Sequence, residues 1–195
     1  FCTPPPKPAP KEAKPVDLNG IAHVRRMYQK YPQMWRGLGE VMCRHDDLTS
    51  MLEDKETPAC NHPGLKAVYQ WACEVNLPVL VHHNADRIAE RIDDGEWEYL
   101  NEVCEVLEMF PKLKFTWVHC GVSRRCAEET HYQMCDDMLD KYPGLKFDIS
   151  WVVWEDVICD ENGDVKPGWV ECIHVVRLAD LGAQVLASRR GPPGA

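Results

Sequence analysis

Long apolar runs are absent from this sequence, because no stretch approaches the ~20 apolar residues that a membrane-spanning helix needs. Basic residues are also few: 22 Lys and Arg stand against 31 Asp and Glu, for a formal net charge of −9. Phosphate binding depends on clustered Lys and Arg, so this balance argues against a nucleic-acid partner. We therefore expect neither membrane nor nucleic acid as a partner, and a small molecule or a protein instead.

Paired cysteine motifs are absent as well. The sequence has 10 cysteines but no CxxC pair. Cys73, Cys104 and Cys135 fall inside stretches typical of amphipathic helices, and Cys120 follows an apolar strand. This scatter predicts buried or half-buried free thiols and neither a disulfide framework nor a zinc ribbon. No signal peptide is recognisable, so we expect a reducing compartment and a cytoplasmic location.

What the sequence does contain is ordinary globular composition, with 45% hydrophobic and 27% charged residues among 195. Residues 1–16 hold six of the 15 prolines, interleaved with lysine, and have little to bury. We predict that they form a disordered, extended tail, with a ligand for a proline-binding module as the less favoured alternative. Residues 17–195 are predicted to form one domain.

Helical and strand patterns alternate through that domain. Helices are predicted at 17–31, 63–76, 96–110, 128–142 and 169–181, and strands at 35–42, 77–81, 114–119, 146–150 and 184–187. The joint at 110–115, Phe-Pro-Lys-Leu-Lys-Phe, is echoed by Tyr-Pro-Gly-Leu-Lys-Phe at 142–147, which is one βα unit later. This rhythm indicates parallel strands with helical crossovers, arranged as an open doubly wound sheet or a (β/α)₈ barrel.

Polar side chains end three consecutive predicted strands at equivalent positions: Glu40, His82 and His119. Chemistry in parallel α/β folds lies at the carboxyl ends of the strands, and adjacent strands are only ~4.8 Å apart. Glutamate and histidine are ligands for Zn²⁺ and similar ions. The sequence therefore predicts a divalent-metal site, with His82 preferred to His83 because strand alternation points His83 to the opposite face.

Less specific candidates accompany these three residues. Glu40 has a structural alternative, an ion pair with Arg36 or Arg44. His131 and Cys135 lie four apart on a predicted helix, where placement in the core or on the surface is favoured over a metal clip. The polar run 44–47 lines the mouth of the site or forms a solvated loop.

Four segments taken in order resemble the amidohydrolase-related proteins of the metal-dependent hydrolase superfamily. They are WRGLGE at 35–40, LPVLVH at 77–82, FTWVHCG at 115–121 and KFDISW at 146–151. The likeness covers about residues 17–160. It implies a (β/α)₈ TIM-barrel fold with a divalent metal at its C-terminal face, zinc first and manganese second. The matched strands correspond to about strands 4 to 7 or 8 of the barrel, so an incomplete barrel is expected.

The resemblance also implies roles for individual residues. A small-molecule substrate would be cut at a carbonyl-type C–N or C–O bond by metal-activated water. Relatives that are decarboxylases on the same scaffold leave the reaction type open. The assignments are His82, His119 and Glu40 as metal ligands, His119, Glu40 and Asp148 as catalytic residues, and Asn84, Trp151 and Arg124 as substrate-binding residues.

Two departures from the family pattern stand out. The sequence has no His-x-His, and Arg189 occupies the place of the aspartate that ends the last strand of the family. We therefore expect the second half of a barrel with impaired catalysis. One alternative is an inactive remnant that serves as a binding module. Another is an unrelated open α/β binding domain, and the lack of a Gly-rich phosphate loop after any predicted strand counts against it. Open sheet edges predict homo-oligomers.

Overall fold

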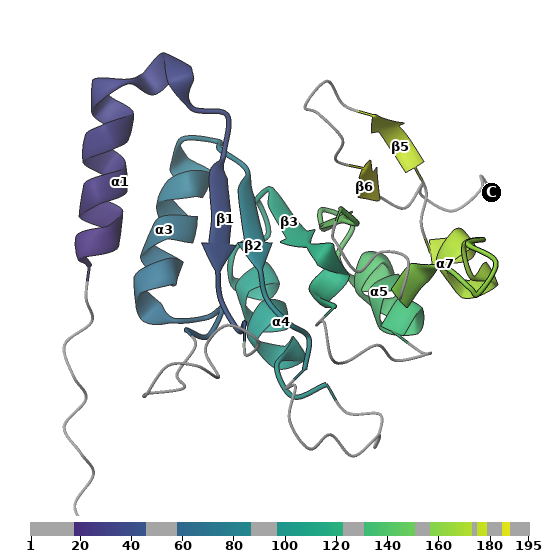
Figure 1. Cartoon of the computed structure of the whole chain (residues 1–195). Helices are drawn as coiled ribbons and strands as arrows, with labels where there is room; N and C mark the ends of the chain where they lie inside the picture. The colour runs from purple at the N-terminus through teal and green to yellow at the C-terminus, as the bar shows by residue number, and fades with distance from the viewer. Residues whose placement is uncertain are drawn as a thin grey trace, which may run out of the picture.

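The computed structural model of the chain describes residues 18–45, 58–86, 97–122, 131–150, 157–172, 175–178 and 185–187. Six strands in this part form one sheet in the order β1-β2-β3-β4-β6-β5 (Figure 1). The first four are parallel and follow the chain: β1 (Leu38–Met42), β2 (Val79–His82), β3 (Phe115–Val118) and β4 (Lys146–Asp148). The α/β class predicted from the sequence is confirmed. The predicted tail 1–16 lies outside the described residues.

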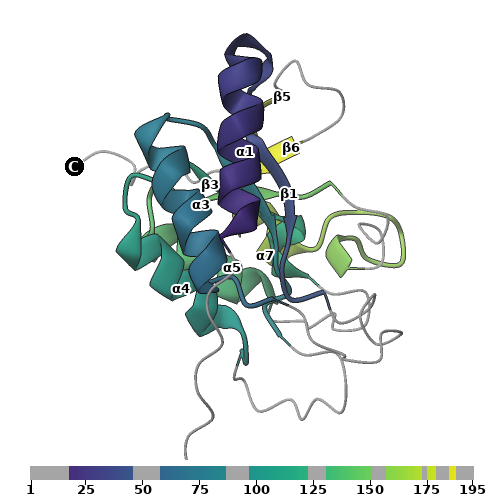
Figure 2. The same ribbon diagram turned by 90° about the vertical axis from the view of Figure 1, so that its left-hand side faces the viewer.

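A helix lies between each pair of successive parallel strands, with one more before β1. The helices are α1 (Asn19–Lys30), α3 (Pro63–Glu74), α4 (Leu100–Met109) and α5 (His131–Lys141). Pro63 suits the first turn of α3, where the His62 side chain accepts a hydrogen bond from the Gly64 amide. Turned by 90°, the structure shows α3 and α4 together on one side of β1 (Figure 2). This arrangement matches the predicted order of elements.

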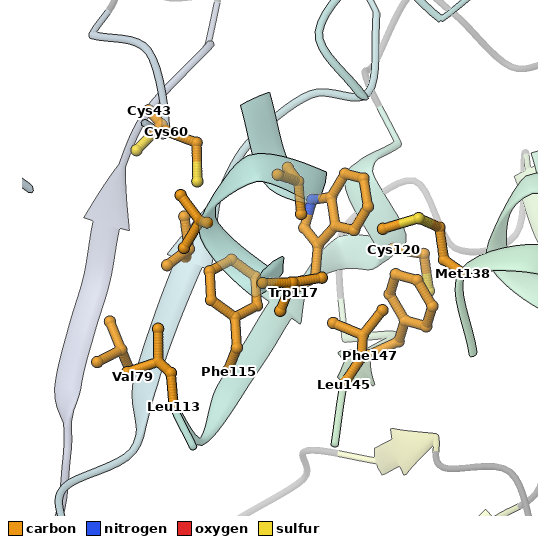
Figure 3. Close-up of a cluster of buried hydrophobic side chains, with 14 of the residues drawn as sticks. Cys43, Cys60, Val79, Leu113, Phe115, Trp117, Cys120, Met138, Leu145 and Phe147 are labelled. Carbon is orange, nitrogen blue, oxygen red and sulfur yellow. The ribbon is translucent and has the colours of Figure 1, made fainter. Parts of the chain in front are cut away.

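The hydrophobic core fills the space between the parallel strands and these helices. Three neighbouring strands supply alternate, almost fully buried residues to this core: Val79 from β2, Phe115 and Trp117 from β3, and Phe147 from β4 (Figure 3). Because side chains alternate along a strand, the residues between them point to the other face of the sheet. That second face is the one that carries the polar strand ends.

The C-terminal part departs from the predicted pattern. The helix expected at 169–181 is shorter and earlier, α7 (Pro167–Cys172), and it is followed by a strand, β5 (Val175–Leu178). The strand predicted at 184–187 is present as β6 (Val185–Ala187), but it runs antiparallel to both β4 and β5. The helix prediction for 175–178 is therefore wrong. This segment begins with two β-branched valines, and β6 supplies the pairing partner that a local pattern does not show.

The described helices are short relative to the thickness of a membrane. None of those in the described ranges is long and apolar enough to cross a bilayer.

Candidate metal centre

The register of the parallel strands aligns their carboxyl ends. His82 of β2 pairs with Val118 of β3, and Val118 pairs with Asp148 of β4. Residues paired in this way on neighbouring strands point to the same face of the sheet. His82 and Asp148 therefore share the face that lies opposite the helices.

Glu40 reaches this face from β1, where the pairing with β2 shifts between Leu38 and Val41. Its Oε1 lies 2.8 Å from Nδ1 of His82. The close approach of the two strands depends on Gly39, which has φ +152°; a Cβ there would lie 2.7 Å from Cβ of Leu80. A side chain at position 39 would thus push β1 away from β2 and separate Glu40 from His82.

His119 arrives by a different route. Simple alternation would point it to the helix side, as it does Trp117, two residues earlier. Instead β3 ends at Val118, and residues His119–Gly121 form a short 3₁₀ turn in which His119 has φ 58° and Cys120 has φ 54°. In this turn Nε2 of His119 lies 3.5 Å from Oε1 of Glu40. Left-handed backbone outside glycine is uncommon, and it is found preferentially at functional sites.

The three predicted ligands converge, although His119 does so through the turn after β3 and not through a strand position equivalent to that of His82. One potential ligand atom from each of Glu40, His82 and His119 lies within 4.8 Å of the other two. The His82 side chain is 4% exposed and that of Glu40 is 38% exposed, so the group is buried on one side and open to solvent on the other. Two imidazoles and a carboxylate form a donor set that suits Zn²⁺ or Mn²⁺.

Burial controls the charge of the imidazoles. It lowers the pKa of His82 to about 4; the nearby His45 ring adds to the effect, and the Glu40 carboxylate opposes it. The pKa of His119 is also lowered by burial, again with Glu40 acting in the opposite direction. Both rings are therefore neutral at physiological pH, which is the form in which histidine binds metals.

His45 supports the site from the segment after β1. Its ring stacks on that of His82 with centroids 4.2 Å apart and an angle of 9° between the planes. The predicted polar run 44–47 is thus divided: His45 lies against the site, Arg44 binds Glu102 instead, and residues 46 and 47 lie outside the described residues.

The remaining predicted site residues are not part of the group formed by Glu40, His82 and His119. Asp148 is 1% exposed, and its Oδ1 accepts a hydrogen bond of 2.8 Å from the Ser150 amide. Asn84 is equally buried, two residues beyond β2, and its backbone amide donates to the Arg44 carbonyl at 2.9 Å. Trp151, Arg124 and Arg189 lie outside the described residues.

The structural alternatives named above are also resolved. Within the described ranges, the short contacts of Glu40 are to His82 and His119, whereas Arg36 binds the carbonyls of residues 33 and 35. His131 donates to the carbonyl of Cys120, and the thiol of Cys135 reaches the same oxygen at 3.7 Å. His131 and Cys135 are therefore core residues, as the favoured interpretation predicted.

Sequence reasoning missed a second group of potential ligands, formed by Cys43, Cys60 and His83, all buried. Without a CxxC pair the cysteines gave no zinc motif. A signal was nevertheless present, because Cys43 follows β1 and His83 follows β2, and these two strands are neighbours in the sheet. Residues that follow the ends of neighbouring parallel strands lie close together on the opposite face too.

Comparison with known proteins adds no identification: no protein-family model matches the chain, and no curated protein does.

Proposed function

We propose that Glu40, His82 and His119 hold a divalent metal ion, zinc or manganese, in a hydrolase of the amidohydrolase type. The substrate class is a small molecule with a carbonyl-type C–N or C–O bond. The observation that carries this proposal is the meeting of three metal-type ligands at the carboxyl ends of three adjacent parallel strands. This is the position at which (β/α)-barrel enzymes build their active sites.

A metal ion bound there would polarise the carbonyl-type oxygen and lower the pKa of water. The chain itself must provide a proton acceptor. Asp148 ends the neighbouring strand β4 and points to the same face as His82. Its Oδ2 is buried and has no hydrogen-bond partner among the described residues, while Oδ1 is held by the Ser150 amide. A carboxylate held through one oxygen, with the other oxygen not hydrogen-bonded among the described residues, suits a general base.

Two contacts hold the ligands in place. The stacked His45 ring restricts rotation of His82, and the turn at 119–121 fixes the direction of His119. Ligands held in this way lose little conformational freedom when a metal binds, which favours affinity.

Metal binding is tested first, by calorimetry with Mn²⁺, because thiolates prefer softer ions and the cysteine cluster will not compete. We expect one Mn²⁺ per chain, and no binding to the double variant His82→Ala/His119→Ala. His23→Ala is the matched control, since His23 is an exposed histidine on α1 that contacts Arg26. Unchanged affinity in the double variant would show that the site assignment is wrong.

Catalysis is tested separately, with the Mn²⁺- or Zn²⁺-loaded chain and a panel of amides, esters and carboxylates. We expect metal-dependent hydrolysis that is slow, because the His-x-His pair is missing and Arg189 stands in place of the family's aspartate. Asp148→Asn should lower this rate a further ~10²- to 10⁴-fold with metal affinity retained. Release of CO₂ without hydrolysis would assign a decarboxylase and overturn the hydrolase proposal. Metal binding without any turnover would also overturn it and leave a binding module.

A further inference from the structure

A second cluster of metal-type donors lies on the helix side of the sheet. Sγ of Cys43, Sγ of Cys60 and a ring nitrogen of His83 all lie within 4.8 Å of one another. The three residues are 1%, 0% and 1% exposed. Cys43 follows β1 and Cys60 precedes α3, and Figure 3 shows the two side by side beyond the carboxyl end of β1.

The histidine is prepared as a ligand. Its Nε2 lies 3.1 Å from the carbonyl oxygen of Tyr99, which can only accept, so Nε2 carries the proton. The lone pair is therefore on Nδ1, and Nδ1 is buried with no hydrogen-bond partner among the described residues. Leaving such an acceptor unsatisfied is unfavourable. A histidine whose other ring nitrogen donates to a backbone carbonyl is typical of metal ligands.

The thiols of Cys43 and Cys60 interact with each other. A hydrogen bond from Cys60 lowers the pKa of Cys43, and the reciprocal interaction, together with burial, raises the pKa of Cys60. The two sulfur atoms lie close together in a site closed to water. A cation bound between them would be coordinated by both sulfurs.

We propose that Cys43, Cys60 and His83 bind a structural Zn²⁺ ion, distinct from the ion at Glu40, His82 and His119. Two thiolates and one neutral imidazole balance the charge of Zn²⁺, as a buried site requires. The Tyr69 hydroxyl lies 3.7 Å from Sγ of Cys60, beside the cluster.

Such an ion would connect three parts of the chain that are distant in sequence. It would tie the end of β1 to the start of α3 and to the end of β2, and so hold the two strands that carry Glu40 and His82. Neighbouring contacts support the same junction, since Glu102 of α4 accepts from the Cys60 amide at 3.1 Å and lies 3.8 Å from Nε2 of His83.

Co²⁺ provides the test, because thiolate ligation gives a near-ultraviolet charge-transfer band that nitrogen and oxygen ligands do not. The background is His82→Ala/His119→Ala, which removes the first site. We expect one Co²⁺ per chain with a strong thiolate band, displaced by Zn²⁺. Adding Cys43→Ser or Cys60→Ser should weaken Zn²⁺ binding by more than the 10- to 100-fold typical of losing an outer-shell partner. Cys73→Ser, a half-buried thiol on α3, is the matched control.

A second measurement avoids the cysteine variants, in case they fail to fold. X-ray absorption of Zn²⁺ bound to the background variant should show two sulfur neighbours at ~2.3 Å and a nitrogen at ~2.0 Å. A thiolate band of undiminished intensity in Cys43→Ser, an environment without sulfur, or no binding at all would each overturn the proposal. Because the first site is absent from this background, failure here is independent of the proposed hydrolase.

Discussion

The turn after β3 determines where the His119 side chain lies. His119, Cys120 and Gly121 follow one another in left-handed backbone conformation, with φ of 58°, 54° and 70°. Each such residue outside glycine costs ~1–2 kcal/mol. The turn is held by the buried neighbours around it, and its result is that His119 lies beside Glu40 rather than on the helix side.

Gly121→Ala is predicted to destabilise the chain by about 2–4 kcal/mol. The alanine would have to adopt φ +70°, and its Cβ would lie 2.6 Å from Cζ2 of Trp117. The indole has no room to move, because Trp117 is fully buried and its N–H donates to the His83 carbonyl at 2.6 Å. Urea unfolding of the metal-free variant measures the effect.

Gly144→Ala is the control for this prediction, since nothing lies within 4 Å of its added Cβ and its φ is not in the left-handed region. We expect it to be neutral or slightly stabilising through reduced freedom of the unfolded chain. Equal stability of the two variants would contradict the role assigned to the turn.

At the scale of elements, helix α4 is joined to the site by one carboxylate. Glu102 of α4 forms an ion pair with Arg44, with Oε1 2.5 Å from Nη2, and it also accepts from the Cys60 amide. The side chains of Arg44 and Glu102 are 24% and 16% exposed, and the guanidinium lies 4.4 Å above the Tyr99 ring. A partly buried, charge-assisted pair of this kind is worth more than a surface pair.

Glu102→Gln is predicted to lower the free energy of unfolding by about 1.5–3 kcal/mol, because it removes the negative charge that faces the partly buried Arg44 guanidinium. Glu108→Gln on the same helix is the matched control. Glu108 pairs with Lys141, and both of these side chains are more than half exposed, so no measurable change is expected. Thermal unfolding of both variants compares them, and a similar loss in each would refute the argument.

Element boundaries were predictable where proline marks them. Pro63 begins α3, and Pro111 and Pro143 follow the ends of α4 and α5, as the sequence indicated. These signals are local, since proline restricts its own backbone and that of its neighbour. Residues 175–178 carried no such marker, and their strand state depends on pairing with β6.

At the scale of the whole molecule, β1 bonds within the described sheet only to β2 and leaves its other side open. Open edges pair with other chains, so we predict that the purified chain self-associates under reducing conditions. Met42, 42% exposed at the end of β1, adds apolar surface there. Met42→Lys should therefore shift the chain toward monomer in light scattering.

Val170→Lys is the control for the edge prediction. Val170 is an exposed apolar residue on α7, 58% exposed and away from β1 in the sheet order. We expect it to leave the association unchanged. A compact monomer already in the unmodified chain would show that β1 is not an interaction edge.

The sequence by itself determined the alternation of helices and strands and the three polar strand ends at Glu40, His82 and His119. These follow from hydrophobic periodicity and from the rule that parallel strands end at one edge, both of which can be applied along the chain. Tertiary structure alone decided the antiparallel pairing of β6, the turn that redirects His119, and the meeting of Cys43, Cys60 and His83. Each of these depends on which distant segments become neighbours, and pairing and burial between distant segments leave no period in the sequence.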